Sequence, residues 1–204
     1  MKEFFKNKKI LITGNKGFKG SWLTLFLSNY SKKIFGISSD NTNDYFFRRV
    51  SLDKKIVTTK LDILNKNRLK SYLLKVKPEI IFHLAAEALV IKSYKSSYKT
   101  MNVNIMGLIN ILEILKDKKF KNITLIVVTS DKCYEPNKNR KFLEEDPLGG
   151  NDIYSASKAC AEIVTKAYSY SFFQHSNKNI KIATVRAGNV IGAGDFGENR
   201  LLPD

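Results

Sequence analysis

The sequence predicts an α/β fold built on a doubly wound parallel sheet with helices on both faces. Short apolar runs alternate with longer amphipathic segments, which is the pattern of parallel strands joined by helical crossovers. The first of these runs continues into a glycine-rich turn and then into a helical pattern. With 204 residues, 43% of them hydrophobic, the chain is long and apolar enough to bury the core of one domain.

Six apolar runs are the expected strands. Strands that are buried on both faces of a sheet have continuous apolar sequences, and residues 123–128 show this most clearly. The predicted strands cover residues 9–13, 34–37, 56–61, 80–84, 123–129 and 180–186.

Four longer segments between the strands are the expected helices, at residues 18–30, 66–76, 98–116 and 153–173. In the first helix, a stripe of side chains recurs at steps of three and four residues and is expected to pack on the sheet. The stripe consists of Phe18, Trp22, Leu25, Phe26 and Asn29. The turn-rich residues 146–150 are expected to be a loop within the domain.

The formal charge of +16 suggests, at first sight, a protein that binds nucleic acid or an anionic surface. However, 29 of the 35 basic residues are Lys, scattered singly or in pairs, whereas specific phosphate recognition favours clustered Arg. We therefore interpret the charge as solvated surface and expect no nucleic-acid partner.

The two cysteines, Cys133 and Cys160, lack the paired spacing of a metal site and are too few for a disulfide scaffold. The apolar run at residues 10–12 is too short for a signal or membrane segment. These features favour a cytoplasmic protein with no bound metal and no membrane partner.

The turn after the first predicted strand has the pattern Gly-x-x-Gly-x-x-Gly, a spacing variant of the dinucleotide-binding fingerprint. A tight turn at Gly14, close approach of the backbone to a pyrophosphate at Gly17 and close helix–strand packing at Gly20 would each require glycine. The helix that begins at Phe18 would offer free N–H groups to the anion. A plain glycine turn in an α/β domain is the alternative.

Two acidic residues extend this predicted site. Asp40 lies twenty residues after Gly20, where an acid can hydrogen-bond the adenosine ribose, although an ordinary loop aspartate fits the position equally well. Asp62 and Ile63 follow the third predicted strand, where the adenine of a cofactor could rest against the backbone.

The fourth predicted strand ends in His83 and in the small residues Leu84, Ala85 and Ala86, at the edge where open α/β sheets bind ligands. We interpret His83 as a packed residue at the strand end rather than a catalytic base, because no partner for it is evident in the sequence.

Tyr154 and Lys158 are four residues apart and so lie on one face of the predicted helix. A free tyrosine has a pKa of about 10 and is a poor base near neutral pH unless a cation stabilises the phenolate. Lys158 could supply that charge and could also hold a nicotinamide ribose. Without the glycine motif upstream, an ordinary surface Tyr–Lys pair would be the simpler interpretation.

Ser130, Asp131 and Lys132 follow the fifth predicted strand, at the same edge of the sheet as the glycine turn. A hydroxyl, a carboxylate and an amine therefore emerge together where a substrate would lie. An acid beside an amine can move protons in opposite directions, which makes these three residues candidate catalytic groups.

These residues together resemble the extended short-chain dehydrogenase/reductase superfamily of nucleotide-sugar enzymes, the NAD-dependent epimerase/dehydratase family. The resemblance rests on the glycine spacing, residues 83–86, Ser130 and the Tyr154-x-x-x-Lys158 pair, and it runs through almost the whole chain. It implies a Rossmann-like fold, a bound NAD and a nucleotide-sugar substrate. Residues 17–23, 129–135, 146–150, 154–162 and 186–192 resemble those of the members that act on CDP-glucose, and this resemblance implies CDP-glucose as the substrate. The Asp131-Lys132 pair is specific, since related hexose dehydratases typically have Asp-Glu there.

The reaction that the resemblance implies converts CDP-D-glucose to CDP-4-keto-6-deoxy-D-glucose. Tyr154, its pKa depressed by Lys158, would take the proton of the C4 hydroxyl, Ser130 would hydrogen-bond the sugar oxygen, and Asp131 would protonate the leaving C6 hydroxyl. Lys132 either removes the C5 proton as a neutral amine, against a reference pKa of about 10.4, or stays charged and stabilises the enolate while another group moves the proton. Another nucleotide-sugar epimerase or dehydratase, or a catalytically incomplete NAD-binding fragment, is the alternative.

Members of this family typically continue past the point where this chain stops, into a smaller substrate-binding region. We therefore expect residues 1–204 to form the NAD-binding domain, with residues 187–204 as the start of a substrate-binding region that is largely missing. Asn189 and Arg200 match positions expected near the substrate phosphates. The resemblance also implies a possible homodimer formed through the helices at residues 98–116 and 153–173.

Overall fold

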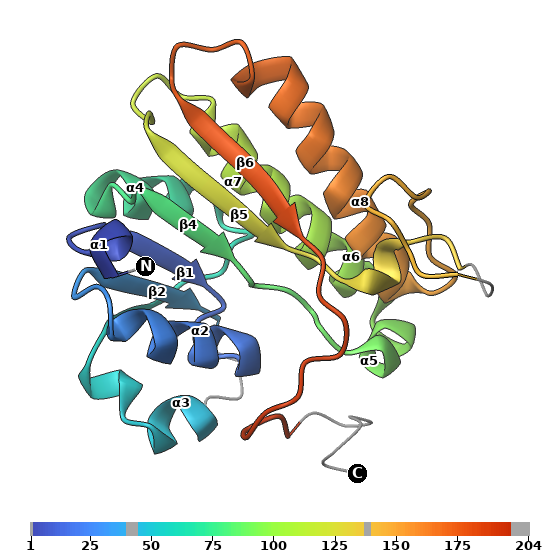
Figure 1. Cartoon of the computed structure of the whole chain (residues 1–204), viewed down its shortest axis with the longest axis horizontal. Helices are drawn as coiled ribbons and strands as arrows, with labels where there is room; N and C mark the ends of the chain where they lie inside the picture. The colour runs from blue at the N-terminus through green and yellow to red at the C-terminus, as the bar shows by residue number, and fades with distance from the viewer. Residues whose placement is uncertain (1, 40–44, 137–139, 197–204) are drawn as a thin grey trace.

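A parallel sheet of six strands forms the centre of the computed structural model, which describes residues 2–39, 45–136 and 140–196 (Figure 1). The strand order is β3-β2-β1-β4-β5-β6, so the direction of winding reverses between β1 and β4. The strands are β1 Ile10–Thr13, β2 Ile34–Ser38, β3 Val57–Lys60, β4 Ile80–His83, β5 Ile123–Val128 and β6 Ile180–Val185. All six predicted strands are confirmed, with ends that differ by one residue at most.

The helices also follow the predicted segments. The longer ones are α2 Phe18–Ser28, α4 Lys66–Val76, α7 Gly107–Leu115 and α8 Ile153–Tyr168, and the shorter ones are α1 Lys2–Phe5, α3 Tyr45–Arg49, α5 Val90–Lys95 and α6 Ser97–Met101. Two π-helical turns, η2 Asn102–Met106 and η4 Ser169–Phe173, continue α6 into α7 and extend α8. Two 3₁₀ turns, η1 Leu52–Lys54 and η3 Asp131–Cys133, complete the described elements.

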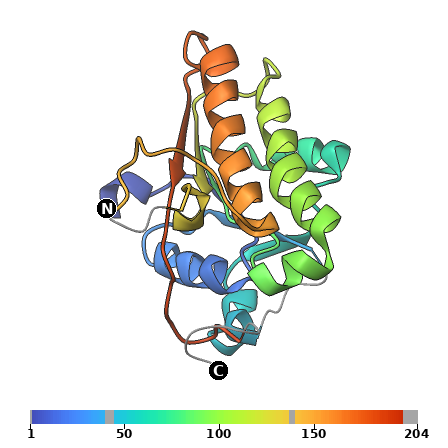
Figure 2. The ribbon, with the colours of Figure 1, turned by 90° about the vertical axis from the view of Figure 1, so that its right-hand side faces the viewer.

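Alternate side chains of the central strand show that helices cover both faces of the sheet. Ile10 and Ile12 pack in one apolar cluster with Leu27 of α2, whereas Leu11 packs in another with residues of α4 and α7. Figure 2 shows the same arrangement from the side, with α7 and α8 on one face of the sheet and α2 on the other. The prediction of a doubly wound, Rossmann-like sheet is therefore confirmed.

The expectation that β5 is buried on both faces is wrong. Ile123, Leu125 and Val127 are buried, but the residues between them are only half-buried. The reason is that β5 and β6 have α7 and α8 on one side, while on the other side no described helix packs against them. Val185 of β6 is accordingly 43% exposed.

The predicted packing stripe of α2 is also wrong. Trp22 and Phe26 are 41% and 43% exposed, and the face that meets the sheet instead consists of Gly20, Ser21, Thr24 and Leu27. Gly20 decides this orientation, because a Cβ there would lie only 2.1 Å from the carbonyl oxygen of Gly14. The small residues of α2 therefore allow the helix to approach β1 closely.

Candidate active site

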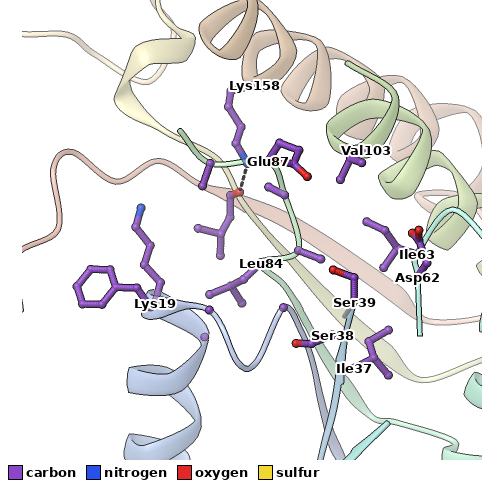
Figure 3. A pocket seen from close by; sticks show the side chains of 18 of the residues that line it. Lys19, Ile37, Ser38, Ser39, Asp62, Ile63, Leu84, Glu87, Val103 and Lys158 are labelled. Atoms are coloured by element: carbon purple, nitrogen blue, oxygen red, sulfur yellow. Dashed lines mark hydrogen bonds between the residues drawn. The ribbon is translucent and has the colours of Figure 1, made fainter. Parts of the chain in front are cut away.

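A cavity of about 290 Å³ opens at the carboxyl ends of the strands, next to the first turn of α2 and the first turns of α8 (Figure 3). Ligand sites of doubly wound sheets lie at this position, where the winding direction reverses. Eleven of the predicted site residues line it: Gly14, Gly17, Phe18, Gly20, Asp62, Ile63, Leu84, Ala85, Ala86, Tyr154 and Lys158. Asp40 and Arg200 lie outside the described residues.

The glycine turn has the geometry that the sequence pattern predicts. Gly14 has a φ of +70°, and a Cβ there would lie 2.8 Å from the backbone nitrogen of Ala85. Gly17 caps α2 without a side-chain hydrogen bond. Because the first N–H groups of a helix have no acceptor within it, the start of α2 can offer them to an anion in the cavity.

Asn15, which the sequence analysis did not single out, holds the glycine turn in place. Its buried side chain donates to Thr58 Oγ1 at 2.8 Å and accepts from Ser38 Oγ at 3.1 Å, so it connects the turn to β2 and β3. Gly36 makes room for it, since a Cβ at that position would lie 2.1 Å from the Asn15 amide.

Asp62 and Ile63 form the opposite wall of the cavity. The Asp62 carboxylate accepts from the backbone N–H of Leu64 at 2.9 Å, which closes a local turn. Asn110 of α7 donates to the carbonyl oxygens of Ile63 and Leu64 at 3.0 and 3.2 Å. This wall is therefore held by a helix that is distant in sequence.

His83 is packed at the end of β4, with 4% of its surface exposed. Its Nδ1 lies 2.8 Å from Thr13 Oγ1, which also accepts hydrogen bonds from the backbone N–H groups of Leu84 and Ala85. Since the Thr13 oxygen already accepts twice, we assign its hydroxyl hydrogen to His83 Nδ1 and the ring proton to Nε2. Burial, and secondarily the charge of Lys158, lowers the pKa of His83 to about 3.

Tyr154 and Lys158 are both buried and both face the cavity from α8. Asp152 starts this helix by accepting a hydrogen bond from the backbone N–H of Ser155 at 2.9 Å. Lys158 Nζ donates to the carbonyl oxygen of Val128 at 3.3 Å and lies 5.9 Å from the centre of the Tyr154 ring.

Two lysines enter the cavity from different elements. Figure 3 shows Lys158 reaching down from α8 and Lys19 extending from the start of α2. Burial, followed by repulsion from Lys19, lowers the pKa of Lys158 to about 8. A buried cation beside a phenol is the arrangement that favours a phenolate.

Ser130, Asp131 and Lys132 lie beside the cavity rather than in its lining. Ser130 is buried and caps η3, while Asp131 and Lys132 are exposed. Ser130 Oγ lies 3.1 Å from Asp131 Oδ1 and accepts from the backbone N–H of Lys132 at 3.3 Å. The three residues follow directly after Thr129, which does line the cavity, whereas Asn189 is exposed in the segment after β6.

Asn104 is a second residue that sequence reasoning missed. It is buried in the π-helical turn η2, where its amide donates to Ser157 Oγ at 2.8 Å and its oxygen accepts from the backbone N–H of Glu87 at 2.8 Å. It thus connects α8 to the cavity wall at Glu87. The pairing of a π-helical turn with a buried amide depends on tertiary contacts and leaves no periodic signal.

The described residues contain no group of three or more His, Cys, Asp or Glu side chains that could hold a metal ion. Within the same ranges, no helix is long and apolar enough to cross a membrane.

The strand order, together with a Tyr-x-x-x-Lys pair that shares a cavity with a glycine turn, defines the class of protein as an extended short-chain dehydrogenase/reductase. Within that class, the chain belongs to the GDP-mannose 4,6 dehydratase family, whose model matches residues 11–184. The predicted resemblance to nucleotide-sugar epimerases and dehydratases is therefore confirmed.

Two curated relatives are similar over nearly the whole chain. A CDP-glucose 4,6-dehydratase of Salmonella typhimurium is 41% identical over 100% of this chain and 58% of its own length. A dTDP-D-glucose 4,6-dehydratase of Dictyostelium discoideum is 32% identical over 96% of this chain and 46% of its own length. The chain thus spans about half the length of these relatives.

Solved structures share the fold. A UDP-glucose 4-epimerase from Brucella ovis in complex with NAD has a TM-score of 0.78 at 22% identity, over 94% of this chain and 56% of that one. A dTDP-glucose 4,6-dehydratase from Bacillus anthracis in complex with NAD has a TM-score of 0.69 at 26% identity, over 86% of this chain and 53% of that one.

Proposed function

We propose that this chain supplies the NAD-binding domain and the catalytic centre of a nucleotide-sugar 4,6-dehydratase that acts on CDP-D-glucose. The observation that carries the proposal is the position of Tyr154 and Lys158, which share one cavity with the glycine turn. The 41% identity to a CDP-glucose 4,6-dehydratase supports the choice of substrate.

The cavity suits NAD on structural grounds. A Cβ at Gly14 or Gly20 would collide with neighbouring backbone, so the turn keeps its main chain bare beside the start of α2, where a pyrophosphate could bind. Asp62 and Ile63 would face the adenine, and Lys158 the nicotinamide ribose. When bound, NAD would accept a hydride from C4 of the sugar and return it to C6.

The chain's own groups would move the protons. Tyr154 Oη would take the proton of the C4 hydroxyl, helped by the buried ammonium of Lys158, while Ser130 Oγ would hydrogen-bond the same sugar oxygen. The resulting C4 ketone acidifies the C5 proton. A base would then take the C5 proton while Asp131 protonates the C6 hydroxyl as it leaves. C5 takes up a proton again when the hydride reaches C6, so that the overall reaction releases one water and leaves the redox balance unchanged.

Lys132 is exposed in this structure, which supports a role as a charged group that stabilises the enolate while another group moves the C5 proton. Removal of the C5 proton by a neutral amine would call for a desolvated side chain, whereas a charged ammonium can stabilise the enolate from an exposed position. A Lys132→Glu variant should therefore lose dehydration while keeping C4 oxidation. A variant with full activity would contradict any role that is specific to lysine.

The decisive experiment incubates the protein, with any in-frame continuation of its gene, with NAD and CDP-D-glucose. We expect a CDP-4-keto-6-deoxy sugar, lighter than the substrate by one water. UDP-glucose, dTDP-glucose and GDP-mannose serve as matched substrates. An isomer of unchanged mass would instead indicate an epimerase, and NAD binding without any product would indicate a catalytically incomplete fragment.

We further propose a homodimer in the cytoplasm. Apolar side chains are exposed along the outer helices, among them Tyr98 of α6 at 82% and Ile163 of α8 at 54%. Both cysteines are free, as expected for a reducing compartment. Sedimentation of the wild-type protein and of an Ile163→Lys variant would test the interface. If the dimer forms through this face of α8, the added charge should dissociate it into monomers.

A further inference from the structure

An ion pair with a buried carboxylate and a partly exposed guanidinium lies behind the cavity, between α8 and the end of β6. Arg186 Nη2 donates to Glu162 Oε2 at 3.0 Å, and the Glu162 side chain is only 4% exposed. The same carboxylate accepts from Thr129 Oγ1 and, at 2.8 Å, from Thr184 Oγ1. Glu162 therefore connects α8 to both β5 and β6.

The other terminal nitrogen of the Arg186 guanidinium, Nη1, binds residues that follow η3. Arg186 Nη1 donates to Tyr134 Oη and to the carbonyl oxygen of Glu144, both at 2.8 Å, and the guanidinium carbon lies 4.7 Å from the centre of the Tyr134 ring. That ring is in turn stacked on Phe142, with centroids 4.6 Å apart.

The residues that Glu162 and Arg186 contact lie next to the candidate catalytic residues of α8 and of η3. Glu162 is one helical turn beyond Lys158 and two beyond Tyr154, while Thr129 directly precedes Ser130 and Tyr134 closely follows Lys132. Glu162 and Arg186 themselves lie outside the cavity lining, so they can act on the site only through these neighbours.

The carboxylate is charged despite its burial. Burial alone would raise the pKa of Glu162, but the hydrogen bonds from Arg186, Thr129 and Thr184 outweigh it and hold the pKa below its ordinary value. Removing one partner would leave a buried charge uncompensated, so the two residues act as a unit.

We propose that Glu162 and Arg186 are positioning residues that hold Asp131 and Lys132 in the orientation, relative to Tyr154, that elimination of water requires. The proposal rests on the dehydratase function. Oxidation at C4 uses Tyr154 and Lys158, which one helix carries, and Ser130, which precedes η3, whereas elimination also needs Asp131 and Lys132 within η3. Loosening the pair should therefore slow elimination far more than oxidation.

Two conservative variants test this in the full gene product loaded with NAD. Arg186→Lys keeps a positive charge beside Glu162, but a single ammonium cannot also reach Tyr134 and Glu144. Tyr134→Phe removes only the hydroxyl that accepts from Arg186. Thr165→Val is the matched control. Thr165 is as buried on α8 as Glu162, but its hydroxyl donates within its own helix, to the carbonyl oxygen of Ala161 at 2.7 Å.

The first readout is a single turnover with CDP-D-glucose, followed by the absorbance of reduced nicotinamide. The absorbance rises as C4 is oxidised and falls as the hydride returns to C6. In Arg186→Lys we expect the fall to be roughly ten- to a hundred-fold slower, with the rise nearly unchanged. Tyr134→Phe should show a smaller slowing of the fall. Thr165→Val should leave both the rise and the fall unchanged.

The second readout is amide hydrogen exchange, which does not depend on activity. Residues 131–135 should exchange faster in Arg186→Lys, with no change in α8. Equal slowing of both phases, or a lower unfolding temperature with no change in either, would show a purely structural role and overturn the proposal. Wild-type protein that forms no 4-keto product would instead overturn the dehydratase function on which it rests.

Discussion

His83 connects the stability of the fold to pH. Its imidazole is buried and neutral, with a pKa of about 3 in the folded chain against an ordinary value of 6.5. Between these two pH values the unfolded chain binds a proton that the folded chain does not, so the free energy of unfolding should fall as the pH is lowered through this range.

Replacing His83 tests that connection. We expect His83→Gln to weaken the loss of stability between pH 6.5 and about 3, because glutamine has no proton to bind. Urea unfolding at several pH values measures the slope, and His175→Gln, an exposed histidine, is the control. Parallel curves for wild type and His83→Gln would contradict a neutral, buried imidazole.

Replacing Tyr154 should slow the reaction without weakening the binding of NAD. Tyr154→Phe removes the phenol but little volume, so we expect about 10²–10⁴-fold slower C4 oxidation with NAD affinity largely kept. Tyr168→Phe is the control, since that hydroxyl binds Glu113 at 2.8 Å, away from the cavity. Binding is measured by calorimetry and oxidation by the nicotinamide absorbance. A Tyr154→Phe protein of normal rate would exclude the tyrosine as the base.

At the scale of elements, α8 brings the pieces of the site together. Its first turns carry Tyr154 and Lys158, its next turn carries Glu162, and Ser157 accepts the hydrogen bond from Asn104. Asp152 fixes where this helix begins, through hydrogen bonds to the backbone N–H and the hydroxyl of Ser155 at 2.9 and 2.6 Å.

The cap of α8 should therefore matter for stability and for the site together. Asp152→Ala should lower the free energy of unfolding by about 1 kcal/mol and reduce NAD affinity, because the first turn frays where Tyr154 lies. Asp152→Asn, which keeps an oxygen acceptor, should retain most of both. Urea unfolding and NAD calorimetry measure the two effects. Equal behaviour of the two variants would show that the cap is not what positions the helix.

At the scale of the whole molecule, the positive charge is spread over different elements. Lysines pair with acids at several places: Lys8, before β1, with Glu79, before β4; Lys70 of α4 with Asp117, after α7; and Lys99 of α6 with Glu87 of the cavity wall. Dispersed lysine produces a weak attraction to polyanions that salt screens, rather than a binding site.

The dispersed positive charge predicts weak, salt-sensitive binding to duplex DNA. We expect the dissociation constant for a mixed-sequence duplex to be weaker than about 10⁻⁵ M at roughly 0.15 M salt, as for non-specific binding. Fluorescence anisotropy measures it, and heparin provides a second polyanion. A sub-micromolar value at that salt concentration would restore nucleic acid as a specific partner.

The sequence by itself determined the strands, the longer helices, the glycine turn and the Tyr154–Lys158 pair. These features are local, because they depend on periodicity, on residues that need unusual backbone angles, or on a four-residue spacing within one helix. The position of the predicted residues at one edge of the sheet also follows from chain order, since parallel strands all end there.

Only the tertiary structure decided which face of α2 meets the sheet, and which polar residues hold the cavity walls. Gly20 turned the large side chains of α2 outward, and Asn15, Asn104 and the Glu162–Arg186 pair join segments that are between 17 and 53 residues apart. Such contacts leave no periodic trace in the sequence, because close approach of backbones and satisfaction of buried polar groups are properties of the packed chain.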